Sequence, residues 1–216
     1  MLVIIQARTS SRRFKNKILY SFYGKKLIQH VFEKIKKSRK VKIIVSTSTN
    51  KKDDKLVKFL IDKKVKYFRG SLNNVAKRLY DTAISEKKSF FLRISGDSPL
   101  IDFRLINKSM KIFEKNKNFD LITNIFPRTF PSGQSVEIIK TKTLGKNLRF
   151  FSKLDKEHVT RYFYRNSSKF KIKNFVNNKH TKNKKLSIDT HDELKRILKT
   201  FTKKKFLNYS YLNEQN

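Results

Sequence analysis

The stretch that decides the fold is Val3-Ile4-Ile5-Gln6-Ala7-Arg8-Thr9-Ser10-Ser11-Arg12-Arg13-Phe14-Lys15-Asn16-Lys17. Four consecutive apolar residues, Leu2 to Ile5, are short and β-branched enough to form a buried strand. A polar loop follows, with five cations in the ten residues from Arg8 to Lys17. A strand that ends in a basic loop can hold a polyanion, above all a triphosphate. The alternative is a solvated basic loop in a chain that is basic throughout.

The length and composition limit the classes of protein. A chain of 216 residues fits one domain with a full hydrophobic core. It has no cysteine, which excludes disulfides, a thiolate nucleophile and a cysteine-bound metal. No apolar run approaches the roughly 20 residues of a membrane helix, and Leu2 to Ile5 is too short for the apolar region of a signal peptide. We therefore expect a cytoplasmic protein without membrane contact.

The net charge of +36 has two interpretations. Such an excess commonly indicates a nucleic acid or an anionic membrane as partner. Here it consists of 40 lysines against 13 arginines, spread along the whole chain. Asparagine, isoleucine and phenylalanine are also plentiful while glycine, proline and tryptophan are scarce, which is typical of A/T-rich codons. We attribute the charge to compositional drift, and nucleic-acid binding stays the less favoured alternative, which would require clustered lysines and steeply salt-dependent binding.

Strand and helix patterns alternate in the first half of the chain. Strands are predicted at 43–45, 65–68 and 90–94, and amphipathic helices at 25–37, 56–61, 75–85 and 106–113, the last capped by Asp102. This alternation predicts an α/β fold of three layers, with a mostly parallel sheet and helices on both faces. Ligands bind at the carboxyl ends of such strands, where the polar loops after Ile5, Val45, Phe68 and Ile94 lie.

The second half is less regular. Strands are predicted at 120–123, 136–139, 170–175 and 186–188, and helices at 141–150, 156–165 and 194–201, with a lysine- and asparagine-rich loop at 177–185. Thr190 and Glu193 form a capping box for the last helix. We expect a single domain over residues 1–216, with a small inserted β arm around 124–175.

Two aspartates, Asp97 and Asp189, each follow a predicted strand, so both can face the same edge of the sheet. Magnesium binds through one or two carboxylates plus substrate phosphates, and it keeps several waters. The pair therefore predicts a magnesium site beside the basic loop. The alternative is that Asp97 is an ordinary turn aspartate and Asp189 a helix cap beside Thr190.

Several blocks of sequence resemble one family in the same order along the chain. Members begin with a strand followed by Gln-Ala-Arg-x-Gly-Ser-x-Arg-Leu-Pro-x-Lys, which Gln6, Ala7, Arg8, Ser11, Arg13 and Lys17 match. The further matching blocks are Ser46-Thr47-Ser48, Phe68-Arg69-Gly70-Ser71 with Arg78, Arg93 to Asp102, Pro127 to Gly133, Val136-Glu137, Glu157-His158-Val159-Thr160 and Ile188-Asp189-Thr190. From Val3 to about Leu198 the chain resembles the cytidylyltransferases that activate acidic sugars, the acylneuraminate and 3-deoxy-manno-octulosonate cytidylyltransferases. It looks closest to the branch of spore coat polysaccharide biosynthesis protein F.

The resemblance implies a fold, a reaction and a set of roles. The fold is that of the nucleotide-diphospho-sugar transferases, with a middle arm that often makes a homodimer. The reaction transfers CMP from CTP to a nonulosonic or octulosonic acid for cell-surface polysaccharide, releasing pyrophosphate. Arg8, Lys17 and Asp97 are the implied catalytic residues, and Asp97 and Asp189 the ligands of Mg²⁺. The implied nucleotide-binding residues are Ala7, Arg8, Ser11, Arg13, Lys17, Thr47, Ser71, Arg78 and Asp97. The implied sugar-binding residues are Arg128, Glu137 and His158.

The chain departs from the family pattern at a few positions. Ser10 stands where the family has glycine, and Lys15-Asn16 replaces a Pro-Gly pair. A glycine lets backbone amides approach phosphate closely, whereas serine restricts this geometry unless its φ stays negative. Ser132 and Ser135 stand where relatives usually carry aspartate. If those aspartates contact the substrate, the resemblance implies that the sugar specificity of this chain is changed or weakened. A degenerate member that acts as a binding subunit is therefore a further alternative.

Overall fold

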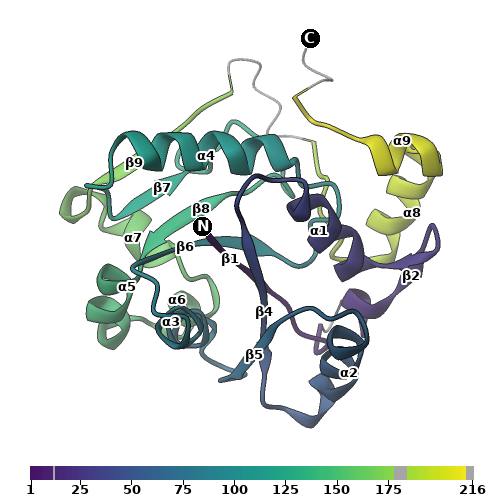
Figure 1. Cartoon of the computed structure of the whole chain (residues 1–216), viewed down its shortest axis with the longest axis horizontal. Coiled ribbons are helices and arrows are strands. Elements are labelled where there is room, and N and C mark those ends of the chain that lie inside the picture. The colour runs from purple at the N-terminus through teal and green to yellow at the C-terminus, as the bar shows by residue number, and fades with distance from the viewer. Residues whose placement is uncertain (12, 178–183, 213–216) are drawn as a thin grey trace.

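The computed structural model describes residues 1–11, 13–177 and 184–212. Within this part of the chain, seven strands form one sheet (Figure 1). Their order across the sheet is β5 (Tyr67–Gly70), β4 (Lys42–Ser48), β1 (Leu2–Gln6), β6 (Phe90–Ser95), β8 (Glu137–Lys140), β7 (Leu121–Thr123) and β9 (Ile172–Asn174). β8 runs antiparallel to both of its neighbours and every other neighbouring pair is parallel, so the sheet is mostly parallel as predicted.

Helices cover both faces of the sheet, which gives the three predicted layers. One face packs against α1 (Leu27–Lys36), α2 (Asp54–Asp62), α4 (Phe103–Lys115), α8 (His191–Thr200) and α9 (Lys203–Asn208). The other face packs against α3 (Val75–Ser85), α5 (Thr141–Asn147) and α7 (Arg161–Arg165), while α6 (Lys153–Glu157) contacts α3. Short 3₁₀ helices occupy Lys17–Leu19, Lys51–Asp53, Leu148–Phe150 and Ser167–Lys169. None of the helices in the described ranges is long and apolar enough to cross a membrane.

Strand β1 shows why a short apolar run forms the centre of this fold. Val3 and Ile5 belong to the hydrophobic cluster beneath α1 and α4, whereas Leu2 and Ile4 belong to the cluster beneath α3. Because side chains alternate between the two faces of a strand, a strand covered on both sides must be apolar throughout. β1 accordingly lies between β4 and β6 in the middle of the sheet.

Helix ends follow the capping signals of the sequence. α3 begins and ends at the predicted residues. Asp102 accepts a hydrogen bond from the backbone N–H of Arg104 at 2.9 Å, and Thr190 with Glu193 forms a capping box. The predicted helix at 156–165 is in fact two, α6 and α7, because the chain leaves the helical conformation at His158 (φ −102°, ψ 71°).

Two further features differ from the sequence predictions. The strand predicted at 186–188 does not form, and this extended segment instead donates backbone hydrogen bonds to the carbonyls of Ser132 and Asp97. The segment 124–175 adds β8 and β9 to the main sheet, and the separate small sheet is the hairpin of β2 (Ser21–Phe22) and β3 (Lys25–Lys26). Most of the loop predicted at 177–185 lies outside the described residues.

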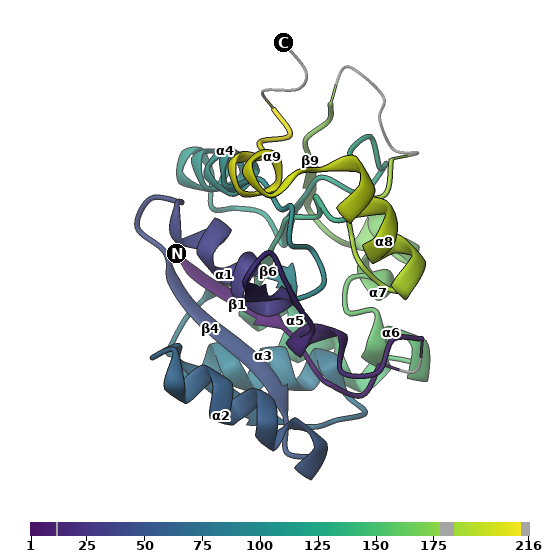
Figure 2. The ribbon, with the colours of Figure 1, turned by 90° about the vertical axis from the view of Figure 1, so that its right-hand side faces the viewer.

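The loop after β1 lies where the two halves of the chain meet. Figure 2 shows this purple segment running toward α6, with α8 above it. An ion pair between Arg8 and Glu157 of α6 fixes that approach. The carboxyl end of β1 therefore faces residues from the middle and from the last part of the chain.

Candidate active site

The carboxyl ends of β1 and β6 lie very close together, and Gly96 makes this possible. Its N–H donates to the carbonyl of Gln6 at 2.9 Å. A Cβ at this position would lie 3.0 Å from that carbonyl oxygen and 3.0 Å from the Cβ of Ala7. A larger residue would therefore push the strand ends apart. As a result, the basic loop that begins at Arg8 and the turn that contains Asp97 start side by side.

One ammonium nitrogen joins the two predicted metal-binding carboxylates. Nζ of Lys17 donates to Oδ2 of Asp97 at 2.9 Å, to Oδ1 of Asp189 at 2.7 Å and to the carbonyl of Ile188 at 3.1 Å. The Lys17 side chain is 9% exposed, and these three acceptors match its three N–H bonds. Asp97 and Asp189, distant in sequence, therefore lie together at the carboxyl edge of the sheet.

Asp189 reaches this point because the residues before it are tied to neighbouring loops. Ile188 donates its N–H to the carbonyl of Asp97 at 2.9 Å. Gly133 has a φ of +91°, and a Cβ there would lie 2.6 Å from the carbonyl carbon of Leu186. Only glycine suits both this conformation and this close approach. The backbone of residues 186–188 can thus pass directly beside the Gly133 turn.

Lys17 and Arg13 keep Asp189 ionised. Burial by itself would raise the pKa of Asp189, but the hydrogen bond from Lys17 and the charges of Lys17 and Arg13 outweigh it and hold the pKa below its ordinary value. Nη2 of Arg13 lies 3.2 Å from Oδ1 of Asp189. Because the Arg13 side chain is 64% exposed, its guanidinium remains accessible to an anionic ligand.

The buried carboxylate of Asp53 anchors the start of the basic loop. It accepts hydrogen bonds from the backbone N–H of Thr9 at 2.7 Å, from the Thr9 hydroxyl at 2.7 Å and from both the N–H and the hydroxyl of Ser48. Burial opposes ionisation, but these hydrogen bonds lower the pKa of Asp53 below its ordinary value. Because these hydrogen bonds hold Thr9 in place, they also fix the position of the preceding residue, Arg8. The local sequence of the loop would not fix it by itself.

The replaced glycines of the family pattern do not strain this loop. Ser10 is not among the described residues with a positive φ. Asn16 takes the left-handed conformation with a φ of +58°, which asparagine tolerates better than most residues. Ser11 closes the turn, since its hydroxyl accepts a hydrogen bond from the N–H of Phe14 at 3.4 Å. Arg12 lies outside the described residues.

Arg78 and Thr47 carry buried polar atoms without partners. The Arg78 side chain is fully buried, and Nη1 donates to the carbonyl of Ser71 at 2.6 Å. Within the described residues, Nε and Nη2 of Arg78 and the hydroxyl of Thr47 have no hydrogen-bond partner. Burial, and next to it the charge of Arg8, lowers the pKa of Arg78 to about 10. Unpaired buried donors are costly, so this arrangement is typical of a site that a ligand completes.

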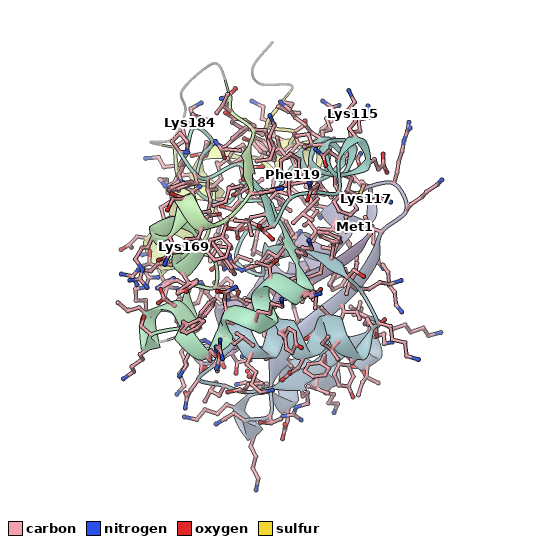
Figure 3. The ribbon with its side chains drawn as sticks, turned by 90° about the vertical axis from the view of Figure 1, so that its left-hand side faces the viewer. Met1, Lys115, Lys117, Phe119, Lys169 and Lys184 are labelled. Atoms are coloured by element: carbon pink, nitrogen blue, oxygen red, sulfur yellow. The ribbon has the colours of Figure 1, made fainter. Side chains whose placement is uncertain are left out.

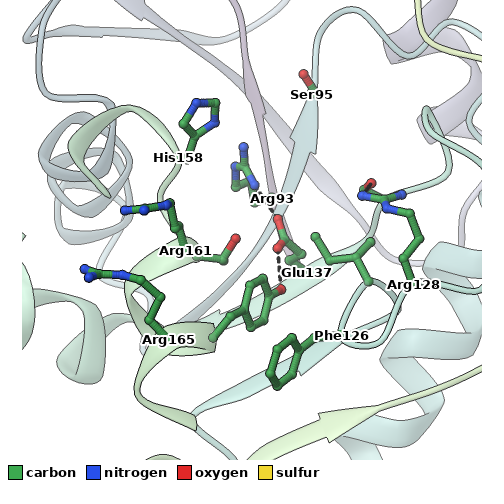
Figure 4. A pocket seen from close by; sticks show the side chains of 12 residues that line it. Arg93, Ser95, Phe126, Arg128, Glu137, His158, Arg161 and Arg165 are labelled. Carbon is green, nitrogen blue, oxygen red and sulfur yellow. Dashed lines mark hydrogen bonds and ion pairs between the residues drawn. The ribbon is translucent and has the colours of Figure 1, made fainter. Parts of the chain in front are cut away.

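A pocket of about 490 Å³ adjoins this edge of the sheet (Figure 4). It contains the three predicted sugar-binding residues Arg128, Glu137 and His158, and it begins at Ser95, two residues before Asp97. Phe126 and Tyr164 stack in it, with ring centroids 4.7 Å apart and an angle of 11° between the planes. A largely preformed hollow with aromatic walls and several charged groups is typical of a small-molecule site.

Glu137 is buried in this pocket between two partners. It forms an ion pair with Arg93 and accepts a hydrogen bond from the hydroxyl of Tyr164 at 2.7 Å (Figure 4). Burial, and next to it the charge of Glu137, raises the pKa of Tyr164 well above its ordinary value, so Tyr164 donates as a neutral phenol. Arg93 also donates to Oε1 of Gln6 at 3.0 Å, which connects the pocket to the end of β1.

Sequence reasoning missed the two arginines of α7. Arg161 and Arg165 line the pocket, and both donate to the buried carboxylate of Asp155, at 2.9 Å and 2.6 Å. The signal was their spacing of four residues, which places both on one side of a helix. This spacing alone did not show that both arginines reach the pocket. The sequence predicted one helix through His158, whereas the structure has a break there, after which α7 turns back toward Asp155.

Asp97 and Asp189 have the right chemistry for a hard divalent cation. Two carboxylate oxygens already share one cationic group, and Mg²⁺ requires no more from a protein when phosphates and waters complete its shell. No cluster of three or more His, Cys, Asp or Glu that could hold a metal occurs among the described residues. These two aspartates would therefore hold a metal only together with its nucleotide.

Comparisons with known proteins agree with this geometry. A family model described as cytidylyltransferase matches residues 2–215. Spore coat polysaccharide biosynthesis protein SpsF of Bacillus subtilis is 26% identical over 180 residues, which cover 80% of this chain and 73% of that protein.

Solved structures give the same result. A cytidylyltransferase from Leptospira borgpetersenii superposes with a TM-score of 0.89 at 30% identity, covering 98% of this chain and 91% of the other. CMP:2-keto-3-deoxy-manno-octonic acid synthetase complexed with CTP superposes with a TM-score of 0.70 at 16% identity, covering 92% and 97%. The chain belongs to the cytidylyltransferase family.

Proposed function

We propose that this protein transfers CMP from CTP to an acidic sugar and releases pyrophosphate. The observation that carries the proposal is the contact of Lys17 with both Asp97 and Asp189, between a cationic loop and an arginine-lined pocket. A hydroxyl group of the sugar attacks the α-phosphorus through its oxygen and loses its proton to the solvent, while the bond from that phosphorus to the bridging oxygen of pyrophosphate breaks. Negative charge then grows on the departing pyrophosphate.

The cations of the loop after β1 serve the triphosphate. Each of these cations already has an acidic partner, which is Glu157 for Arg8 and Asp189 for Arg13 and Lys17, so the three are positioned before the anion arrives. Fixed cations that face developing negative charge are the main source of catalysis in phosphoryl-transfer chemistry. Ala7 and Ser11 shape the backbone of this loop, as their burial and hydrogen bonding indicate.

Arg78, Thr47 and Ser71 would hold the nucleoside. The N–H groups of Arg78 and the hydroxyl of Thr47 that lack a partner among the described residues are a donor set that carbonyl and ring-nitrogen acceptors of a pyrimidine can satisfy. The relative that was solved with CTP has the same fold, which supports the choice of nucleotide.

Asp97 and Asp189 would hold Mg²⁺. When bound, the ion neutralises phosphate oxygens and polarises the phosphorus toward attack. The two aspartates orient the reacting groups, and Lys17 keeps their oxygens together. Arg128, Glu137 and His158 would then bind the sugar, with the carboxylate of the sugar on Arg128.

A pyrophosphate-release assay tests the proposal. Purified protein is mixed with Mg²⁺, one of CTP, UTP, ATP or GTP, and a panel of nonulosonic and octulosonic acids. We expect release that requires CTP, the metal and an acidic sugar together. Binding of CTP without release for any acid would favour a degenerate binding subunit. Absence of CTP binding, with salt-sensitive binding of nucleic acid, would favour the alternative based on the lysine excess.

Assembly as a homodimer remains a prediction, which light scattering on the same sample tests.

A further inference from the structure

The cations of the pocket are all arginines, against the bias of the whole chain. Four of the 13 arginines line it, whereas none of the lysines in the described part of the chain does. Elsewhere lysine dominates the basic surface: Figure 3 shows Lys115, Lys117, Lys169 and Lys184 spread widely over one side. A second hollow, at the amino ends of β1 and β6, is lined by seven lysines and two arginines within the described ranges. A compositional drift toward lysine therefore does not explain why the cations of this pocket are arginines.

Arginine is suited to a particular ligand chemistry. Its planar guanidinium binds carboxylate and phosphate groups through two parallel hydrogen bonds, whereas lysine offers a point charge. Four arginines around one pocket indicate that anionic groups of the substrate are recognised there by shape and by charge.

The charges of the pocket do not balance. Arg93 is neutralised by Glu137. Arg161 and Arg165 share the single carboxylate of Asp155, so one positive charge of this pair remains.

Arg128 has neutral partners in the structure. It donates to the carbonyl of Pro131 at 3.4 Å and to the hydroxyl of Ser135 at 3.2 Å. Arg128 is half-buried, and this burial lowers the pKa of its guanidinium. The carboxylate whose charge acts on Arg128 is that of Glu137, which is already paired with Arg93. Because a partly buried charge whose carboxylate is shared is costly, Arg128 is the second place where an anionic group of a ligand would be favourable.

These two positive positions lie on different sides of the pocket. Figure 4 shows Arg128 on one side and Arg161 and Arg165 on the other, with Phe126 and Glu137 between them. A single carboxylate can engage one of these positions but leaves the other without an anion.

We propose that the acceptor carries two anionic groups, one held by Arg128 and the other by the pair of Arg161 and Arg165. This inference rests on the proposed function, whose acceptor it makes more specific. The chemical class is a sugar acid with a second carboxylate or a phosphate at the other end of its carbon chain. The two contacts would orient the chain so that a hydroxyl faces Ser95, two residues before Asp97.

Direct binding of three matched six-carbon acids tests this without turnover. Gluconate has one carboxylate, glucarate has a carboxylate at each end, and 6-phosphogluconate has a carboxylate and a phosphate. Titration calorimetry of the full chain should give at least about tenfold tighter binding of one of the doubly anionic acids than of gluconate, as one added charge-assisted contact supplies. If glucarate binds more tightly than 6-phosphogluconate, the second anionic group is a carboxylate, and if 6-phosphogluconate binds more tightly, it is a phosphate. Equal affinity of the three acids, including no binding by any, would overturn the inference.

Variants assign the preference to Arg128. Arg128→Gln should bring the affinity for the preferred double anion down to that for gluconate. Ser135→Asp places a carboxylate next to Arg128 and should have the same effect, so the test does not depend on the folding of one variant. The matched control is Arg149→Gln, an exposed arginine outside the pocket, which should bind all three acids like the wild type. A preference that survives in both pocket variants would contradict the inference.

The outcomes separate this inference from the proposed function. A protein that transfers CMP to a singly charged sugar acid and shows no preference for double anions keeps the function and loses the inference. A protein that prefers double anions but never releases pyrophosphate from CTP keeps the pocket assignment and loses the function.

Discussion

Replacing Arg78 with methionine should make the protein more stable while it destroys the nucleotide site. Arg78 is fully buried, and two of its guanidinium nitrogens have no hydrogen-bond partner in the part of the chain that the structure describes. Such groups cost folding free energy that a ligand can recover. Methionine has a similar length and no polar group to satisfy, so it can fill the same space. The direction of the effect is opposite to that of most substitutions of a buried residue.

The magnitude follows from the hydrogen bonds at this residue. Removing the unpaired buried donors gains about 2 kcal/mol. Losing the bond from Nη1 to the carbonyl of Ser71 costs about 1 kcal/mol, since it leaves that acceptor without its donor. The net gain of about 1 kcal/mol corresponds to a Tm increase of about 2–4 °C for a domain of this size.

Thermal unfolding followed by circular dichroism, with and without CTP and Mg²⁺, measures both effects. Arg78→Met should unfold at a higher temperature than the wild type without ligand and should lose the stabilisation by CTP that the wild type shows. The control is Lys77→Met on the exposed side of the same helix, which removes only a surface ion pair with Asp81 and should change stability by less than about 0.5 kcal/mol. A less stable Arg78→Met protein that still responds to CTP would refute the reasoning.

Two further predictions concern the supports of the site. Asp53→Asn should lower the unfolding free energy by about 2 kcal/mol at pH 7, because an amide cannot accept all the hydrogen bonds from Thr9 and Ser48. Since the folded pKa of Asp53 is depressed, its contribution is present above the unfolded pKa of about 3.9 and is lost as the pH falls through the folded pKa. Urea titrations at pH 7 and at pH 3 should therefore show a smaller difference between the two proteins at the lower pH, and a constant difference would speak against this role. Gly133→Ala should destabilise the protein by about 2 kcal/mol or more and reduce CMP transfer, because its Cβ would lie 2.6 Å from the Leu186 backbone. Gly24→Ala, at a φ of +80° with open space around it, is the matched control and should cost about 1 kcal/mol from the backbone alone; equal losses for the two variants would contradict the close approach.

The layers of the fold could be predicted from the sequence because local patterns determine them. Leu2 to Ile5 is apolar on both strand faces, and Asp102 and Thr190 mark helix starts by their side-chain chemistry. Segments whose conformation depends on residues distant in the sequence were harder to predict. Residues 186–188 are held in place by the backbone of Ser132 and Asp97 and not by a neighbouring strand, so their apolar pattern misled the prediction.

The candidate site was predictable only in part for the same reason. Asp97 follows β6, so its position at the sheet edge could be expected from the topology. Asp189 lies beside it for another reason, because backbone hydrogen bonds to Ser132 and Asp97, and not a strand, hold the residues before it. The contact of Lys17 with both aspartates could not be predicted from the sequence. It depends on the positive φ of Asn16 and on the close approach of the Leu186 backbone to Gly133. Arg161 and Arg165 depend on a helix break that sequence periodicity does not show.

The central claim is that Asp97 and Asp189 act as one carboxylate pair on a single metal ion. Its most direct test is the binding of Mn²⁺, followed by electron paramagnetic resonance in the presence of CTP, in the wild type, Asp97→Asn, Asp189→Asn and the double variant. Either single variant should lose the bound Mn²⁺ signal and pyrophosphate release while remaining folded, and the double variant should be no worse than the single ones. Single variants that each keep the bound ion, or turnover close to that of the wild type, would contradict the account.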